Sequence, residues 1–285
     1  MGSSAGSVTP AILAAVLFAA VLHATWNAIA HGVNDRLVAF AMIGLADVLG
    51  GALVVSFVGL PPAAAWPFII GSALAHIAYN SLLLLSYGLG EFSQVYPLAR
   101  GTAPVIVACV SLTLLGHDLR PQDLLGILTI SAGLIGLVVA GGGLRRAHAP
   151  AVAAAFATGL MIALYTVIDG LGVVRGPLLP YIGWLFLLQG PVLPVVAVIR
   201  RRHELGIFLR TGAAAGLAGG FISLLAYAIV LWAQTSGALA PIAALRESSI
   251  VVGALIGAAF LHEPLGHRRA VAAAVVLCGV VLLSV

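Results

Sequence analysis

Long apolar runs separated by short polar breaks dominate this chain. Each run is about 20 residues or longer, which is the length that an α-helix needs to cross a hydrocarbon core of about 30 Å. We therefore predict an all-α membrane protein with ten spanning helices and no room for a sizeable soluble domain. The candidate spans lie near residues 10–31, 36–59, 64–88, 92–115, 121–141, 149–171, 178–199, 208–233, 238–261 and 267–285.

The composition indicates that lipid surrounds most of the chain. Only 8% of the 285 residues are charged and 62% are hydrophobic, and the mean hydropathy is +1.16. A soluble domain carries about 25% charged residues because its surface must face water. The two cysteines, Cys109 and Cys278, lie inside apolar runs, so we predict no disulfide framework. The first run has no basic segment before it, so we interpret it as a retained span.

The two halves of the chain repeat at a constant shift of 146 residues. This shift places Arg100 on Arg246 and Gly133 on Gly279 without a gap. A polar segment, residues 141–150, separates a first repeat, residues 1–141, from a second, residues 149–285. Because each repeat holds five spans, the second is expected to be inverted relative to the first. Inverted repeats predict a substrate site between the halves, near the bilayer midplane.

The arginines predict an orientation, since all 13 basic residues are arginine. Loops on one side hold nine of them, and the other side holds only Arg120 and Arg175. The positive-inside rule then makes the first side cytoplasmic and puts both termini outside. The nine are Arg36, Arg145, Arg146, Arg200, Arg201, Arg202, Arg210, Arg268 and Arg269.

Two arginines lie at membrane depth. Arg100 and Arg246 are about eight residues, or roughly 12 Å, into their predicted spans. Charged side chains at this depth indicate a functional site, and a guanidinium there needs an acceptor on the protein or on an anionic substrate. Glu247 is adjacent to Arg246 and does not share its helix face. Asp47 or Asp169 is therefore a better candidate for a purely structural ion pair, which is the alternative to substrate contact.

Other polar side chains recur at helical spacing. Facing lipid they would be costly, so as a set they predict a wet central cavity, although hydrogen bonding between helices explains any one of them. The 146-residue shift also places His23 opposite Asp169, which predicts a proton-linked pair. The stripes are His23, Trp26, Asn27 and His31; His76, Tyr79 and Asn80; Tyr96 and Arg100; Tyr165 and Asp169; and Ser223, Tyr227 and Gln234.

Prolines and glycines modify the predicted helices. Prolines within spans predict kinks or unwound turns, and glycines at GxxxG spacing predict close helix packing. His262 and His267 are five residues apart with a proline between them, so they do not form a zinc-protease motif. We expect no enzyme activity, cofactor or metal. The prolines are Pro97, Pro104, Pro191, Pro194 and Pro241, and the glycines are Gly212, Gly216, Gly220, Gly253 and Gly257.

Several motifs resemble a known family. YPLARGTAP at Tyr96–Pro104, LRESS at Leu245–Ser249 and FLHE at Phe260–Glu263 are similar to the EamA branch of the drug/metabolite transporter superfamily. The resemblance covers essentially the whole chain and implies a multi-pass transporter of the bacterial inner membrane. Glu263 matches the family's span-ending glutamate, whereas His117 stands at the corresponding position of the first half. The family's cytoplasmic termini conflict with the arginine distribution, so orientation stays open.

These observations lead to one functional hypothesis. We predict secondary-active transport of a small anionic or zwitterionic metabolite, such as an amino acid or phosphonate, by proton coupling or exchange in a monomer or homodimer. The alternatives are export of cationic amines or drugs through Asp47, Asp169 or Glu247, and lipid flipping. We expect no nucleic-acid partner. Arg100 and Arg246 would bind the anionic group, and His23, Asp169 or Glu247 would carry the coupling proton. The remaining residues of the predicted substrate site are Trp26, Asn27, His76, Tyr79, Asn80, Tyr96 and Tyr165.

Overall fold

The computed structural model describes residues 8–31, 33, 35–89, 92–140, 149–260 and 267–284. Helices account for nearly all of these residues, and none of them forms a strand. Seven helical segments in this part of the chain are long and apolar enough to cross a membrane, and two shorter apolar helices accompany them. The chain is therefore an all-helical, multi-pass membrane protein.

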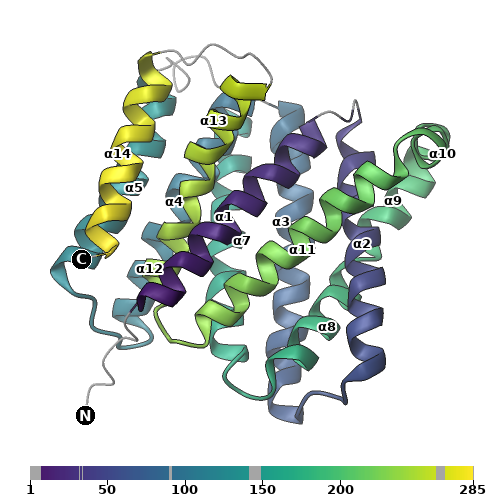
Figure 1. Cartoon of the computed structure of the whole chain (residues 1–285), viewed down its shortest axis with the longest axis horizontal. Helices are drawn as coiled ribbons and strands as arrows, with labels where there is room; N and C mark the ends of the chain where they lie inside the picture. Colours follow the sequence, from purple (N-terminus) through teal and green to yellow (C-terminus); the bar gives the residue numbers. More distant parts are fainter. Residues whose placement is uncertain are drawn as a thin grey trace.

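The helices follow one another with short connections (Figure 1). The first half contains α1 (Pro10–His31), α2 (Arg36–Phe57), the 3₁₀ turn η1 (Ala63–Ala65), α3 (Trp66–Leu89), α4 (Phe92–Thr113) and α5 (Pro121–Ala140). The second half contains α7 (Ala149–Gly172), α8 (Leu178–Gln189), α9 (Val192–Arg200), α10 (Arg202–Thr211), α11 (Ala213–Gln234), α12 (Leu239–Leu245), the 3₁₀ turn η2 (Arg246–Ser248), α13 (Ser249–Phe260) and α14 (His267–Ser284).

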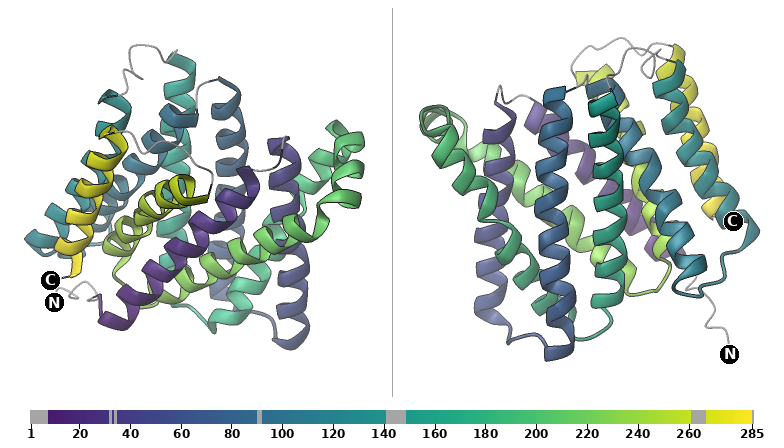
Figure 2. Two further views of the ribbon diagram at one scale, coloured as in Figure 1. Left: turned by 45° about the horizontal axis from the view of Figure 1, so that its top comes forward. Right: turned by 180° about the vertical axis from the view of Figure 1, so that it is seen from behind.

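The arrangement places four helices at the centre and a group at each end (Figures 1 and 2). In the middle, α1 packs against α11 and α3 against α7. At one end α5 lies beside α14, and α4 packs against α5, α7 and α12. At the other end α2 packs against α8, α9 and α11. Helix α1 begins and α14 ends at the same edge of the bundle (Figure 1).

One helix was not predicted. The sequence predicted a span over residues 208–233, whereas α11 begins at Ala213 and a separate helix, α10, precedes it. Gly212 ends α10 with φ −138° and ψ 8°, outside the helical region, so the two helices cannot be continuous. Helix α10 exposes Ile207 and Leu209 and buries only Leu205. An amphipathic helix of this kind does not cross a membrane.

The prolines interrupt fewer helices than expected. Helix α4 runs unbroken through Pro97 and Pro104, and α12 contains Pro241 within its first turn, where no hydrogen-bond donor is needed. Within the predicted span 178–199, the helix is interrupted at Gly190–Pro191, between α8 and α9. Within the predicted span 238–261, the helix is interrupted at η2, which contains no proline.

Small residues allow the end helices to approach closely. A Cβ atom on Gly126 of α5 would lie 2.7 Å from Leu283 Cγ and 3.0 Å from the Gly279 carbonyl oxygen of α14. A Cβ on Gly279 would lie 2.8 Å from the Gly126 carbonyl oxygen. Glycine permits this contact between helices in lipid, where no hydrophobic effect drives them together.

The Gly126–Gly279 contact gives a first prediction. Gly126→Ala should lower the free energy of unfolding by about 1–3 kcal/mol, because the added methyl group must displace packed atoms. Gly136→Ala, on the same helix, is the matched control, since its Cβ would meet nothing within 4 Å. The measurement is thermal unfolding of the purified proteins in detergent. Equal midpoints for the two variants would contradict this packing.

Candidate functional site

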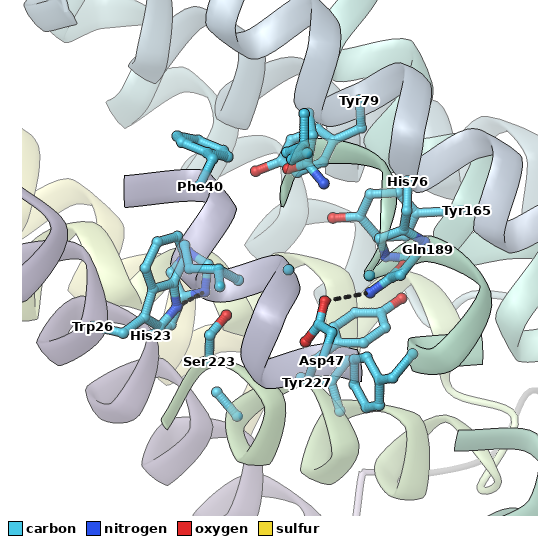
Figure 3. A pocket seen from close by; sticks show the side chains of 18 of the residues that line it. His23, Trp26, Phe40, Asp47, His76, Tyr79, Tyr165, Gln189, Ser223 and Tyr227 are labelled. Atoms are coloured by element: carbon cyan, nitrogen blue, oxygen red, sulfur yellow. Dashed lines mark hydrogen bonds between the residues drawn. The ribbon is translucent and has the colours of Figure 1, made fainter. Parts of the chain in front are cut away.

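A cavity of about 100 Å³ lies among α1, α2, α3, α7, α8 and α11 and reaches α4 and η2 (Figure 3). About 10–15 Å³ is enough for one water molecule, so this cavity accommodates several waters or one small metabolite. Most of its lining is aromatic, apolar or polar without charge. The polar and aromatic lining residues are His23, Trp26, Phe40, Asp47, His76, Tyr79, Asn80, Arg100, Tyr165, Phe186, Gln189, Ser223, Tyr227 and Arg246.

A break in the α12–α13 segment positions the charged residues. Helix α12 is buried along its whole length and ends at Leu245, and the 3₁₀ turn η2 then carries Arg246, Glu247 and Ser248. The tighter 3₁₀ winding changes the direction in which consecutive side chains point. Such interrupted helices line the substrate sites of many transporters.

Arg100 of α4 forms a buried ion pair with Glu247. Its Nε atom lies 2.7 Å from Glu247 Oε2, and the two side chains are 2% and 1% exposed. Its Nη2 atom also donates to Ser249 Oγ at 3.2 Å. This pair joins the first half of the chain to the second. Glu247 is thus the partner of an arginine that is distant in sequence.

Arg246 is buried without an equivalent partner. It is 5% exposed, and its Nη2 atom donates to the Tyr165 hydroxyl at 3.1 Å. Its Cζ atom lies 5.8 Å from the ring centroid of Tyr165 and 6.0 Å from that of Tyr227, which is the range of cation–π contact. Its Nε atom has no hydrogen-bond partner, and no carboxylate forms a salt bridge with Arg246 in the described part of the chain. The guanidinium therefore faces the cavity with its charge only partly compensated.

The carboxylates proposed as partners of Arg246 lie elsewhere. Asp169 of α7 is fully buried and accepts hydrogen bonds from the hydroxyls of Tyr181, at 2.7 Å, and Tyr227. Tyr227 lines the cavity and Asp169 does not, so the tyrosine lies between this carboxylate and the cavity. Asp47 accepts from Gln189 instead. The predicted ion pairs of Arg246 with Asp47 or Asp169 are therefore wrong.

His23 has its own partner as well. Its Nδ1 atom accepts a hydrogen bond from Trp26 Nε1 at 3.2 Å, and the two rings meet edge to face. Among the described residues, no hydrogen bond joins His23 to Asp169, whose carboxylate accepts from two tyrosines, so the proton linkage of the two residues stays a prediction. Both His23 and Trp26 line the cavity.

An aromatic cluster forms one wall. The rings of His76 and Tyr165 stack with centroids 3.9 Å apart, and the Tyr227 ring meets His76 edge-on at 5.1 Å. Tyr79 meets Tyr165 edge-on at 5.7 Å. His76 Nδ1 also contacts Ser72 Oγ at 3.2 Å. These contacts fix the rings that surround Arg246.

On the α2–α8 side, the sequence did not assign Gln189 to the substrate site, and Asp47 was predicted only as an ion-pair partner of Arg246 or as a binding carboxylate of the alternative amine exporter. Gln189 Nε2 donates to Asp47 Oδ2 at 3.1 Å, and both residues line the cavity (Figure 3). Glycines bring their helices together: a Cβ on Gly44 would lie 2.5 Å from the Gly190 carbonyl oxygen. Two features of the sequence could have indicated this pair of residues. Asp47 and Gln189 are lone polar residues in two apolar runs, and the neighbouring glycines, Gly44 and Gly190, are separated by the 146-residue repeat shift.

Some predicted site residues do not line the cavity. Asn27 Nδ2 donates to the His23 backbone carbonyl at 2.7 Å, so it is turned toward its own helix. The Tyr96 ring lies 5.9 Å from Arg100 Cζ, and Gln234 approaches the Thr166 carbonyl at 3.5 Å. The side chain of His31, the segment 141–148 and residues 261–266, with His262 and Glu263, lie outside the described parts of the chain.

The buried ion pair gives a second prediction. Glu247→Ala should lower the free energy of unfolding by about 3–5 kcal/mol, because it leaves the Arg100 guanidinium buried and unpaired. Asp123→Ala is the control, since Asp123 pairs with a half-exposed arginine, Arg120, which water can solvate, and such a pair should contribute about 0–1 kcal/mol. Replacing both partners, Arg100→Met with Glu247→Leu, should recover much of the loss. Thermal unfolding in detergent measures all three, and a Glu247→Ala protein as stable as the Asp123→Ala protein would refute the assignment.

Comparisons with known proteins agree with this geometry. The EamA-like transporter family matches residues 149–285. No curated protein matches the chain. Among solved structures, 29 chains match, and one crystal structure, described only as that of a protein, aligns with a TM-score of 0.74 and 19% identity over 96% of this chain and 98% of its own. At this identity the likeness shows a shared fold alone. Residues 149–285 thus match the EamA-like transporter family, which is part of the drug/metabolite transporter superfamily.

Proposed function

We propose that the protein is a secondary-active transporter that carries a small anionic or zwitterionic metabolite across the bacterial inner membrane. Arg246 carries the proposal. A guanidinium that is 5% exposed and has no carboxylate partner is costly in a low-dielectric interior. A carboxylate or phosphonate group on the substrate would supply the missing charge and accept two parallel N–H groups.

The proposed architecture is ten spans in two inverted repeats, residues 1–141 and 149–285. It counts α8 with α9, and α12 with α13, as single interrupted spans. In this architecture α7 corresponds to α1, α11 to α3, and α13 to α4. The contacts support a two-fold relation between the halves, because the α1–α11 contact corresponds to the α7–α3 contact, and the α4–α7 contact corresponds to the α13–α1 contact. Gly44 and Gly190, separated by the repeat shift, also touch each other.

Alternating access follows from this architecture. Arg100 comes from the first half and Arg246 from the second, and both line one cavity. Rocking of the halves around a central site would expose that cavity to each side of the membrane in turn. A substrate anion bound by Arg246 would move with it through both states.

The charges near the cavity support proton coupling over simple uniport. Two guanidiniums lie in or near the cavity, and so do three carboxyl groups, which leaves one surplus negative charge if all five are ionised. The guanidiniums are those of Arg100 and Arg246, and the carboxyl groups are those of Asp47, Asp169 and Glu247. A proton on one carboxyl group would balance it. Asp169 suits this role because the Tyr227 hydroxyl connects it to the cavity.

Counterflow in proteoliposomes tests the substrate role of Arg246. Wild-type protein should exchange labelled 2-aminoethylphosphonate, and Arg246→Ala should reduce apparent affinity at least about 30-fold, the cost of truncating a buried charge pair. Arg175→Ala is the control, because Arg175 is exposed and contacts Phe68 away from the cavity. Wild-type exchange by a folded Arg246→Ala protein would refute the assignment. Flux of amines with no exchange of any anion would favour the cation exporter instead.

The coupling role of Asp169 is tested separately. Asp169→Asn keeps the acceptor for a tyrosine hydroxyl but cannot release a proton. We expect this variant to retain counterflow while losing accumulation of substrate driven by a pH gradient. Asp35→Asn, at the start of α2 and outside the cavity, is the control. Gradient-driven accumulation at the wild-type level by Asp169→Asn would assign the proton to another group.

A further inference from the structure

The geometry points to an ammonium-binding subsite formed by Asp47 and Gln189, so that the substrate is a zwitterion whose positive group lies between α2 and α8. The inference rests on the proposed transport function and deepens it by naming the substrate class. It concerns the part of the cavity lining that Asp47 and Gln189 provide. There the lining comes from α2 and α8, on the other side of the four central helices from α4 and α12 (Figure 1).

Within the described parts of the chain, the two side chains present a carboxylate that no cation pairs with and an amide oxygen that accepts no hydrogen bond. Asp47 is 7% exposed, and an amide, Gln189 Nε2, donates to it at 3.1 Å. No arginine pairs with this carboxylate in the described residues. The Oε1 atom of Gln189 is buried and has no hydrogen-bond partner. A primary ammonium group carries three N–H donors and one positive charge, which suits a carboxylate beside an amide oxygen.

The backbone holds this subsite in place. Asp47 lies one turn after Gly44 on α2, and Gln189 directly precedes Gly190 at the end of α8. Cβ atoms on these glycines would lie 2.5 Å and 2.8 Å from the carbonyl oxygen of the opposite glycine. The backbones therefore touch, and the side chains one turn away are brought within hydrogen-bond distance. Phe40 and Phe186, from the same two helices, also line the cavity.

The cavity lining therefore carries groups suited to both signs of ligand charge. Among the residues that the structure describes, Arg246 of η2 provides a positive charge that no salt bridge compensates, and Asp47 of α2 provides a carboxylate that no arginine pairs with. A zwitterion satisfies both groups. An anion without an amine leaves Asp47 uncompensated, and an amine without an acid group leaves Arg246 uncompensated. Burying either charge alone is costly. The small volume favours a short chain between the two ligand charges.

Matched ligand pairs test the subsite. Counterflow of labelled 2-aminoethylphosphonate should be inhibited by the unlabelled compound at concentrations about 10- to 100-fold lower than by ethylphosphonate, which lacks only the amine. β-Alanine and propionate form a second pair with the same expectation. Asp47→Asn should bring the two members of each pair to within about threefold of each other. Asp123→Asn, on α5 and outside the cavity lining, should keep the wild-type ratio.

A second variant keeps the test informative if Asp47→Asn does not fold. Asp47→Glu retains the charge and extends the carboxylate by one methylene group. It should shift the preference from 2-aminoethylphosphonate toward aminomethylphosphonate, whose charges are one methylene closer. An unchanged preference for chain length in a folded Asp47→Glu protein would overturn the subsite. Ligand-induced thermal stabilisation in detergent reports the same preference without transport.

The outcomes separate this inference from the proposed function. Absence of exchange with every zwitterion and anion in wild-type protein would overturn the transport proposal itself. Exchange by Asp47→Asn with the wild-type preference for amines would overturn only the subsite. If that variant also lost accumulation driven by a pH gradient, Asp47 would be the coupling residue instead, and the subsite would again be overturned.

Discussion

The ion pair between Arg100 and Glu247 determines how the remaining charges at this site are arranged. Burying a guanidinium away from water is costly unless a carboxylate and further acceptors compensate it, and Arg100 obtains both from η2 and the start of α13. Glu247 is adjacent to Arg246 in sequence, yet it is committed to the other half of the chain. The pair therefore leaves the second arginine open toward the cavity. The ion pair that stabilises the fold thus also leaves Arg246 in need of an anionic partner in the cavity.

The sequence predicted the helices and their inward faces better than it predicted the contacts between them. Lipid tolerates few polar side chains, so a stripe such as His76, Tyr79 and Asn80 had to face inward, and all three line the cavity. The inward-facing stripes could not predict which charged residues pair with each other. That pairing depends on the 3₁₀ turn at Arg246–Ser248, which the helical period does not predict and which contains no proline.

The predictions that failed share a physical cause. The partner of Arg246 was sought among carboxylates on other spans, but two tyrosine hydroxyls hold Asp169 and an amide holds Asp47. Neutral side chains donate to both carboxylates, and hydropathy does not distinguish such donors from side chains with a purely structural role. Gln189 was missed for the same reason. Family membership has the same limit, because related chains share a scaffold while a few cavity side chains select the substrate.

The contact of Gly44 with Gly190 has a mechanical consequence. Most helix pairs interlock through side chains, so turning one helix against the other requires several rotamers to change together. Here backbone meets backbone, with carbonyl oxygens of each glycine against the other residue and no Cβ between them. A small rotation about this point needs no rotamer change at the contact itself. The two helices that carry Asp47 and Gln189 can therefore pivot there while remaining in touch.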